Sequence, residues 1–268
     1  MSNLSVLLPV AATSDTDGLR RAHRSVTEQT SPPDEIVLVT NQPLTDDVET
    51  AINNIVAMNS NSRHEHIPGA RGLGGVLESG LEKCSKPFVA RMDADDIAKP
   101  ERFADQLVVL RETGADIVGS HLAEFRDDPE RPERIRKVPV THDEIAGWMP
   151  WRCPMNHPTV MFDREAVLDV GGYRTFPMME DWDLWARCLA AGLRFRNLDR
   201  VLVHAKICGL NDRRGGLDYV RAEVRMAQEL RKLGISSRRD MIRHLSLRGP
   251  PRLLPPKLRE RVYQRFAR

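Results

Sequence analysis

The chain has 268 residues, enough for one large domain or for one domain with an appendage. Its 41% hydrophobic and 29% charged residues are ordinary for a soluble globular protein. The four cysteines are far apart and have no C-x-x-C spacing, so neither a zinc site nor a disulfide framework is expected. No apolar run approaches the ~18 residues that a membrane-spanning helix needs.

The net charge of +2 hides an uneven distribution along the chain. Residues 231–268 contain twelve Lys or Arg against two acids, so this segment carries +10 and the first 230 residues carry −8. Basic segments of this kind meet nucleic acid, anionic lipid or acidic partners. We therefore expect an acidic body with a basic C-terminal segment.

Apolar runs and helical periodicities alternate from the N-terminus. The runs 5–10, 35–40 and 88–93 predict buried strands, and a helical spacing of apolar residues follows each of the first two. Residues 100–114 then predict a helix with Pro100 in its first turn, and 115–120 a further strand. Strands that alternate with helices predict an α/β, Rossmann-like fold, with a mostly parallel sheet and helices on both faces.

An acidic cluster stands at the end of the predicted strand 88–93 and is formed by Asp93, Asp95 and Asp96. In open parallel sheets, ligands bind outside the carboxyl ends of the strands, and Asn41 follows its own strand at the same edge. Mg²⁺ and Mn²⁺ prefer oxygen ligands, usually one or two protein carboxylates with substrate phosphates. Asp93 and Asp95 therefore suit a metal–diphosphate site, and the alternative is an acidic turn exposed to water.

The stretch 178–192, "MMEDWDLWARCLAAG", predicts a helix with one apolar stripe. Glu180 and Asp181 stand at its start, where the helix dipole favours acids, so capping is the simplest interpretation. For Asp181 the alternative is a general base presented at the edge of a cleft.

Two other stretches hold candidate site residues. Asn156 and His157 come just before an apolar strand, and a lone histidine there is either structural or a ligand. Arg213 and Arg214 stand beside glycines in "NDRRGG", which suits a loop that holds phosphate with planar guanidinium donors. The alternative for that loop is an ordinary turn exposed to water.

The order of these motifs resembles the family 2 glycosyltransferases, in the branch with amylovoran-type and O-antigen enzymes. The resemblance is carried by a first strand ending in Pro-Val, then "EIVLVT", "ARMDADDI", "NHPTVMF", "GGY", "MEDWDLW" and "DRRGG", and it covers nearly the whole chain. It implies a GT-A fold, a nucleotide-sugar donor, a divalent metal (Mn²⁺ or Mg²⁺) and inversion at the anomeric carbon.

The resemblance also implies roles for single residues. Asp95 would bind the metal and the diphosphate, with Asp93 beside the ribose or the metal. Asp181 would be the catalytic base, and the loop with Arg213 and Arg214 would close over the diphosphate. The other residues that it assigns are Pro9 and Asn41 on the donor side and Glu180, Asn156 and His157 on the acceptor side.

The sequence departs from this family in two places. Relatives usually have an acidic residue that holds the nucleobase where this chain has Asn41. An Asn carbonyl can still accept from uracil N3–H and its NH₂ can donate to O4, so uridine recognition stays open beside other bases. The glycine-rich segment has Ala70 and Glu78 where Asn is expected, which leaves the choice of sugar open.

The function we predict is an inverting glycosyltransferase of polysaccharide or O-antigen biosynthesis. It would move a sugar from a nucleotide-diphosphate sugar, by expectation UDP-linked, to a hydroxyl of a glycan or a lipid-linked oligosaccharide. The alternatives are a non-catalytic nucleotide-sugar-binding protein and a sugar nucleotidyltransferase, although the latter needs a glycine-rich basic loop that "LLPVAATSDTDG" lacks. We divide the chain into a catalytic domain, 1–216, and a helical basic extension, 217–268.

The last twelve residues, 257–268, have the pattern of a basic amphipathic helix. Leu258, Val262 and Phe266 recur every four residues among arginines, which is typical of a helix that lies in a membrane interface. We therefore expect a cytoplasmic protein that is peripheral on the inner membrane face and docks on its anionic surface. Nucleic acid is not expected as a partner, because this segment offers only Tyr263 and Phe266 for stacking.

Overall fold

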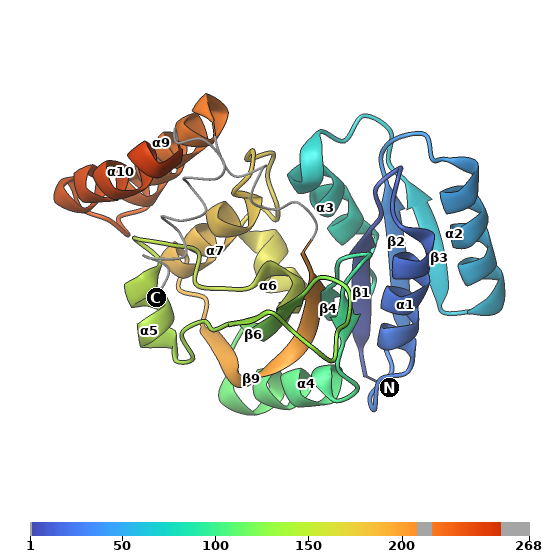
Figure 1. Ribbon diagram of the computed structural model, residues 1–268. Helices are drawn as coiled ribbons and strands as arrows, with labels where there is room; N and C mark the ends of the chain where they lie inside the picture. The colour runs from blue at the N-terminus through green and yellow to red at the C-terminus, as the bar shows by residue number, and fades with distance from the viewer. Residues whose placement is uncertain (1, 208–215, 253–268) are drawn as a thin grey trace.

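The computed structural model describes residues 2–207 and 216–252 (Figure 1). In these ranges the strands are β1 Leu4–Pro9, β2 Glu35–Thr40, β3 Ser62–His66, β4 Phe88–Arg91, β5 Ile97–Ala98, β6 Ile117–Phe125, β7 Arg134–Arg136, β8 Met161–Asp163 and β9 Phe195–Lys206. The helices are α1 Thr16–Thr27, α2 Asp46–Met58, α3 Gly72–Lys83, α4 Arg102–Thr113, α5 His142–Trp148, α6 Arg164–Asp169, α7 Glu180–Ala190, α9 Leu217–Lys232 and α10 Arg238–Arg252, with a 3₁₀ turn at His157–Thr159.

All described strands join one sheet in the order β3-β2-β1-β4-β8-β6-β9-β5, with β7 paired to β6. The first four strands in this order run parallel, because a helix connects each to the next along the chain. β8 runs antiparallel to both of its neighbours, whereas β6 and β9 are parallel to each other. The predicted α/β class is therefore confirmed, with antiparallel strands inserted in the second half of the sheet.

Both faces of the sheet are covered by helices, and the strand residues alternate between two cores. In β1, Leu4, Val6 and Leu8 belong to the core beneath α1, α2 and α4. Leu7 belongs to the opposite core, which includes α3 and α7. A strand that is buried on both faces becomes a continuous apolar run, which is why β1 and β2 were recognisable in the sequence.

Helix α4 matches its predicted position closely. It begins at Arg102, two residues after Pro100, and ends before Gly114, which has a φ of 65°. A glycine in this left-handed conformation terminates many helices, because a side chain would be strained there. The helix predicted for 178–192 is α7, which begins at Glu180 as expected.

Among the elements that were not predicted, which include the short β5, β7, α5 and α6, the most informative are β3, β9 and α3. β3 is polar, with the sequence SRHEH, because it is an edge strand that pairs only with β2. β9 carries several charged residues along its twelve positions. α3 contains four glycines, which disfavour a helix in isolation, so its packing against β1 and β2 has to stabilise it.

The C-terminal extension is helical where the structure describes it. α9 contributes Tyr219, Ala222, Met226 and Leu230 to the same core as α7, and α10 packs along α9 (Figure 1). No helix in the described ranges is long and apolar enough to cross a bilayer. The division of the chain at residue 216 remains a prediction.

Gly74 in α3 allows this helix to approach the segment that leads into α7. A Cβ at this position would overlap the backbone carbonyl oxygen of Arg174 and would lie 3.2 Å from the Cβ of Glu180. We expect Gly74→Ala to lower the free energy of unfolding by about 1–3 kcal/mol, as overpacking does. Urea denaturation followed by circular dichroism measures this change.

Gly147 in α5 provides the matched control, because a Cβ there meets no atom within 4 Å. Gly147→Ala should be neutral or stabilising by up to about 1 kcal/mol, since alanine favours the helix. Equal effects of the two substitutions would contradict the close contact between α3 and the Arg174 backbone.

Candidate functional site

The carboxyl end of β4 carries a buried ion pair between Arg91 and Asp93. Arg91 is only 2% exposed, and its two terminal nitrogens donate to the two carboxylate oxygens of Asp93, one of them at 2.6 Å. Burial disfavours the charge of Arg91, but Asp93 more than offsets this effect, so the pKa of Arg91 is raised. This two-pronged geometry fixes the position of Asp93.

Asp95 and Asp96 complete the acidic cluster. The half-buried Asp95 has a raised pKa, first because of burial and then because of the charge of Asp93. Asp96 is 2% exposed, and its Oδ1 accepts from the backbone N of Lys206 in β9 at 2.9 Å. Its pKa is raised well above the usual range by burial and then by the other two carboxylates. The cluster therefore favours a bound cation or proton.

The donor set of this cluster fits a hard divalent cation. In the described ranges no three His, Cys, Asp or Glu side chains are arranged as ligands of one ion, but Mg²⁺ and Mn²⁺ need only one or two protein carboxylates beside a diphosphate. Arg91 engages both oxygens of Asp93, so Asp95 is the better candidate ligand. The buried Oδ2 of Asp96 also lacks a hydrogen-bond partner among the described residues.

Glu180 and Asp181 form the second acidic group, in the first turn of α7. The Oδ1 of Asp181 accepts from the backbone N of Trp182 at 2.8 Å, and its Oδ2 accepts from the thiol of Cys153 at 3.5 Å. Burial raises the pKa of Glu180 to about 7, and the charge of Asp181 acts in the same direction. Val89 of β4 and Trp182 of α7 belong to the same core, and the charges of Arg91 and Asp93 also contribute to the pKa of Glu180.

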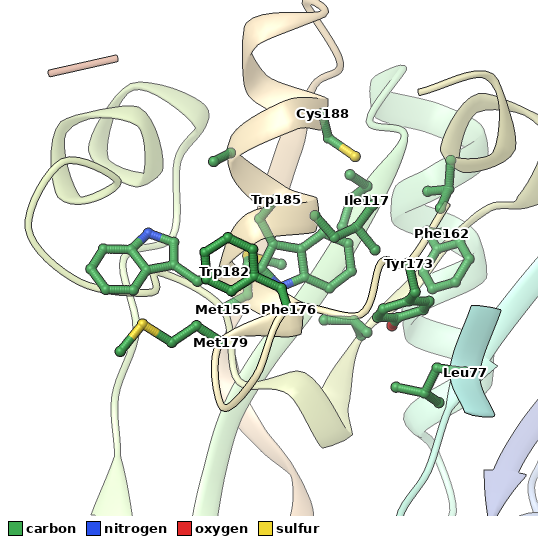
Figure 2. Packing of buried hydrophobic residues seen from close by; sticks show 14 of the residues in the cluster. Leu77, Ile117, Met155, Phe162, Tyr173, Phe176, Met179, Trp182, Trp185 and Cys188 are labelled. Atoms are coloured by element: carbon green, nitrogen blue, oxygen red, sulfur yellow. The ribbon is translucent and has the colours of Figure 1, made fainter. Parts of the chain in front are cut away.

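Aromatic packing holds α7 in this position. Trp185 is fully buried, and its ring makes edge contacts with Tyr173 and Phe195. Figure 2 shows Trp185 between Trp182 and Tyr173. The indole nitrogen of Trp182 donates to the carbonyl oxygen of Met149 at 3.1 Å. The residue after Asp181 is thus anchored to the core, which orients the start of the helix.

Asn156 and His157 are buried and bound to other parts of the chain. The amide of Asn156 donates to the carbonyl oxygens of Ser120 and Arg136 at 2.9 and 3.1 Å. His157 forms a 2.8 Å hydrogen bond with the hydroxyl of Tyr173, and burial keeps its pKa well below the usual range. These contacts support a structural role for both residues. The acceptor-side role of Asn156 and His157 stays a prediction.

The donor-side residues Pro9 and Asn41 lie at the ends of β1 and β2. Pro9 is the last residue of β1 and is half-buried. The amide nitrogen of Asn41 donates to the carbonyl oxygen of Ala70 at 3.0 Å, which joins β2 to the segment before α3. The other two predicted donor ligands, Arg213 and Arg214, lie outside the described residues.

Arg91 and Cys153 are site residues that the sequence reasoning missed. Arg91 stands two positions before Asp93, so the alternation of side chains along a strand placed both on one side. That signal was available in "ARMDADDI". No pattern in the sequence connects Cys153 with Asp181, which is 28 residues away.

The comparisons with known proteins agree on one family. The model of Glycosyl transferase family 2 matches residues 5–171. An uncharacterized glycosyltransferase of Haemophilus influenzae is 35% identical, with 98% of each chain covered. The amylovoran biosynthesis glycosyltransferase AmsE of Erwinia amylovora is 31% identical, over 97% of this chain and 98% of the relative. The UDP-Gal:alpha-D-GlcNAc-diphosphoundecaprenol beta-1,3-galactosyltransferase of Escherichia coli is 30% identical, over 98% and 96%.

Solved structures are similar in fold. TarS 1–349 of S. aureus in complex with UDP-GlcNAc has a TM-score of 0.64 at 17% identity, over 85% of this chain and 66% of that chain. The mannosyltransferase PcManGT of Pyrobaculum calidifontis, in complex with GDP-Man and Mn²⁺, has a TM-score of 0.62 at 16% identity, over 91% and 68%. These neighbours are GT-A glycosyltransferases, so the predicted GT-A fold is confirmed.

The raised pKa of Glu180 makes stability depend on pH. Between about 4.5, the ordinary value, and about 7, the folded chain retains a proton that the unfolded chain has released. The free energy of unfolding should therefore fall as pH rises through this window. Glu180→Gln should remove this contribution, which urea denaturation at pH 5 and pH 7.5 measures without added metal.

Glu165→Gln is the control, because Glu165 is exposed in the first turn of α6. It should keep the pH dependence of the unmodified chain. An unchanged pH dependence in Glu180→Gln would mean that Glu180 is ionised in the folded protein at pH 5.

Proposed function

The chain belongs to glycosyl transferase family 2, and from this premise we propose that it transfers a sugar from a UDP-sugar to a hydroxyl of a lipid-linked glycan, with inversion at the anomeric carbon. The predicted membership of this family is confirmed. The observation that carries the proposal is that two acidic groups, at the end of β4 and at the start of α7, stand on elements that pack into one core. The first suits the donor diphosphate, and the second suits the attacking hydroxyl.

The names of similar proteins support the class of donor and acceptor. The E. coli relative is named for UDP-Gal and for a diphosphoundecaprenol-linked GlcNAc, and TarS was solved with UDP-GlcNAc. In this chain Asp95 would hold the divalent ion, and Asp93, fixed by Arg91, would face the nucleotide. A bound Mn²⁺ or Mg²⁺ would supply positive charge against the diphosphate.

Asp181 is the side chain that we assign as the base. The backbone N–H of Trp182 and the thiol of Cys153 hold its carboxylate, so the proton of the acceptor hydroxyl would be taken at a fixed place. Proton transfer of this kind contributes about 10²–10⁴-fold to a rate. A diphosphate leaves as an anion, so the chain needs no second carboxyl group as a general acid.

Two substitutions test these roles because they should fail in different ways. Asp181→Asn keeps the shape of the side chain and removes its basicity, so turnover should fall at least about a hundredfold while UDP affinity stays the same. Asp95→Asn should abolish Mn²⁺-dependent binding of UDP. Turnover is measured as UDP release from UDP-sugars, and affinity by titration calorimetry.

Glu180→Gln serves as the comparison for the base. If Glu180→Gln loses turnover and Asp181→Asn does not, the neighbouring carboxyl is the base. Unchanged UDP affinity in Asp95→Asn would place the metal elsewhere. A chain that binds UDP-sugars but neither transfers nor hydrolyses them would be a binding protein, the alternative that the sequence left open.

We also propose that the basic C-terminal segment docks on an anionic membrane surface at the cytoplasmic face, near a lipid-linked acceptor. In the described part of the segment, α10 exposes the apolar residues Ile242 and Leu247, at 55% and 62%, together with the basic Arg239 and Arg243. The amphipathic run 257–268 lies outside the described residues. Each basic residue near anionic lipid can add up to ~1 kcal/mol, reduced by salt.

Flotation with liposomes measures this docking. The full chain should rise with vesicles that contain phosphatidylglycerol at low salt and stay down with neutral vesicles. A chain that ends at residue 252 keeps α10 and its contacts with α9, and it should rise less. Equal flotation of the two chains would remove residues 253–268 from the membrane contact.

A further inference from the structure

Three arginines belong to segments that meet near the candidate base, and the carbonyl oxygen of Arg136 accepts from the amide of Asn156, three residues after Cys153. Arg136 ends β7, Arg152 follows α5, and Arg248 lies in α10. The thiol of Cys153, next to Arg152 in sequence, lies 3.5 Å from the Oδ2 of Asp181 and is within reach of the charge of Arg136. We call Arg136, Arg152 and Arg248 the arginine cluster.

The charge of the arginine cluster is largely uncompensated. In the described ranges neither Arg136 nor Arg152 forms an ion pair, and Arg152 contacts the ring of Trp148 instead. The pKa of Arg152 is lowered, first by burial and then by the charges of Arg136 and Arg248. Like charges repel, although water screens this repulsion where Arg152 is exposed, so a bound anion would stabilise the arrangement.

Two members of the cluster are held by contacts with the chain, although Arg152 is exposed to solvent. The guanidinium of Arg152 lies 4.0 Å from the centroid of the Trp148 ring. Arg248 donates from Nη1 to the carbonyl oxygen of Trp151 at 3.2 Å and lies 5.5 Å from the Trp182 ring centroid. Arginines fixed on aromatic rings lose little freedom on binding a planar or tetrahedral anion.

Glu223 explains how Arg248 is oriented. This carboxylate is fully buried in α9, and it accepts from Nε of Arg248 at 3.1 Å and contacts His244 at 2.8 Å. Glu223 thus offsets charge behind Arg248, and the excess positive charge of the cluster comes mainly from Arg136 and Arg152. A diphosphate that joins a lipid to a sugar is a diester with one negative charge on each phosphate, which matches this excess.

The cluster lies away from the donor side. In the view of Figure 1, α5 and α10 lie on one side of α7, and β1, β2 and α3 lie on the other. Contacts agree with this view, because α10 meets α7 through Trp182 and His244, whereas α3 approaches it through Gly74 and Glu180. A diphosphate bound by the cluster is therefore a different one from the donor diphosphate at Asp95.

We propose that the arginine cluster binds the diphosphate of a lipid-linked acceptor and so holds the acceptor sugar beside Asp181. The inference rests on the proposed function and names the binding site of its second substrate. The E. coli relative, whose name contains a diphosphoundecaprenol-linked GlcNAc, gives a chemical probe of the same class. Arg136 and Arg152 are accordingly specificity-determining residues that would make no contact with the reacting atoms.

The test is the binding of a synthetic diester, P¹-dodecyl-P²-α-GlcNAc diphosphate, to the full chain by titration calorimetry. Arg152→Gln and Arg136→Gln should each weaken this binding about tenfold or more, because a hydrogen bond between charged groups is lost. Dodecyl GlcNAc, which lacks phosphate, should bind weakly and equally to all chains. Thermal melting shows that each variant is folded.

Arg225→Gln is the matched control, since Arg225 also lies over an aromatic ring, Phe176, at 4.5 Å but stands outside the cluster. It should leave the affinity for the diester unchanged. Unchanged affinity in both cluster variants, or no binding of the diester to the unmodified chain, would overturn the proposal. The proposal would also be overturned if the cluster variants bound the diester normally and lost only the binding of inorganic pyrophosphate or of phosphatidylglycerol vesicles. The cluster would then be a site for free phosphate or for a lipid headgroup.

The binding of UDP with Mn²⁺ and the turnover of UDP-sugars are measured on the same samples. If the unmodified chain has neither, the proposed function fails, whatever the diester does. If it transfers sugar to the diester and the cluster variants transfer with unchanged KM, only the present inference fails. A rise in KM for the diester with unchanged KM for the donor supports it.

Discussion

The buried guanidinium of Arg91 has to keep a carboxylate beside it, and the donor side of the site follows from this constraint. Removing one partner of a buried ion pair costs about 3–5 kcal/mol, because the other charge remains without compensation. Asp93 is therefore a structural residue as well as a candidate ligand. A second buried arginine, Arg102 at the start of α4, donates to the carbonyl oxygen of Arg91 at 2.8 Å and so holds the end of β4. Its pKa falls to about 9, through burial and then the charge of Arg91.

The opposite side of the site depends on α7, and α7 depends on the C-terminal helices. Trp182 follows Asp181 directly, and its ring meets His244 and Arg248 of α10. Both of these residues are held by the buried Glu223 of α9. A carboxylate with no exposure needs such partners, so Glu223 joins α9 to α10. The described part of the extension thus packs against the helix that carries Asp181, the candidate base.

The fold was predictable where burial on both faces leaves an apolar run, as in β1, β2 and β4. It was not predictable where pairing with a single neighbour is enough to form a strand, as in the polar edge strand β3, because such a strand needs no apolar run. The glycines of α3 oppose a helix locally, and close contacts explain two of them: Gly74 against the carbonyl oxygen of Arg174, and Gly80 against Leu7 of β1. Helix starts and strand ends were readable, so Asp95 could be placed after a strand and Asp181 at a helix start, and their roles in one site stay a prediction. The arginine cluster joins segments more than a hundred residues apart, and no local spacing encodes it.

Both substrates of the proposed reaction carry a diphosphate, so the chain has to distinguish two similar anions. A cluster of carboxylates such as Asp93, Asp95 and Asp96 repels a bare diphosphate and accepts one only together with a cation. A cluster of arginines accepts a diphosphate directly, through hydrogen bonds between charged groups. Under the proposed assignment, a diphosphate without a cation would meet like charge at the carboxylates, so that side would accept the donor diphosphate only together with its metal ion. The sequence separates an acidic body from a basic segment, and the site separates acidic side chains from basic ones in a similar way.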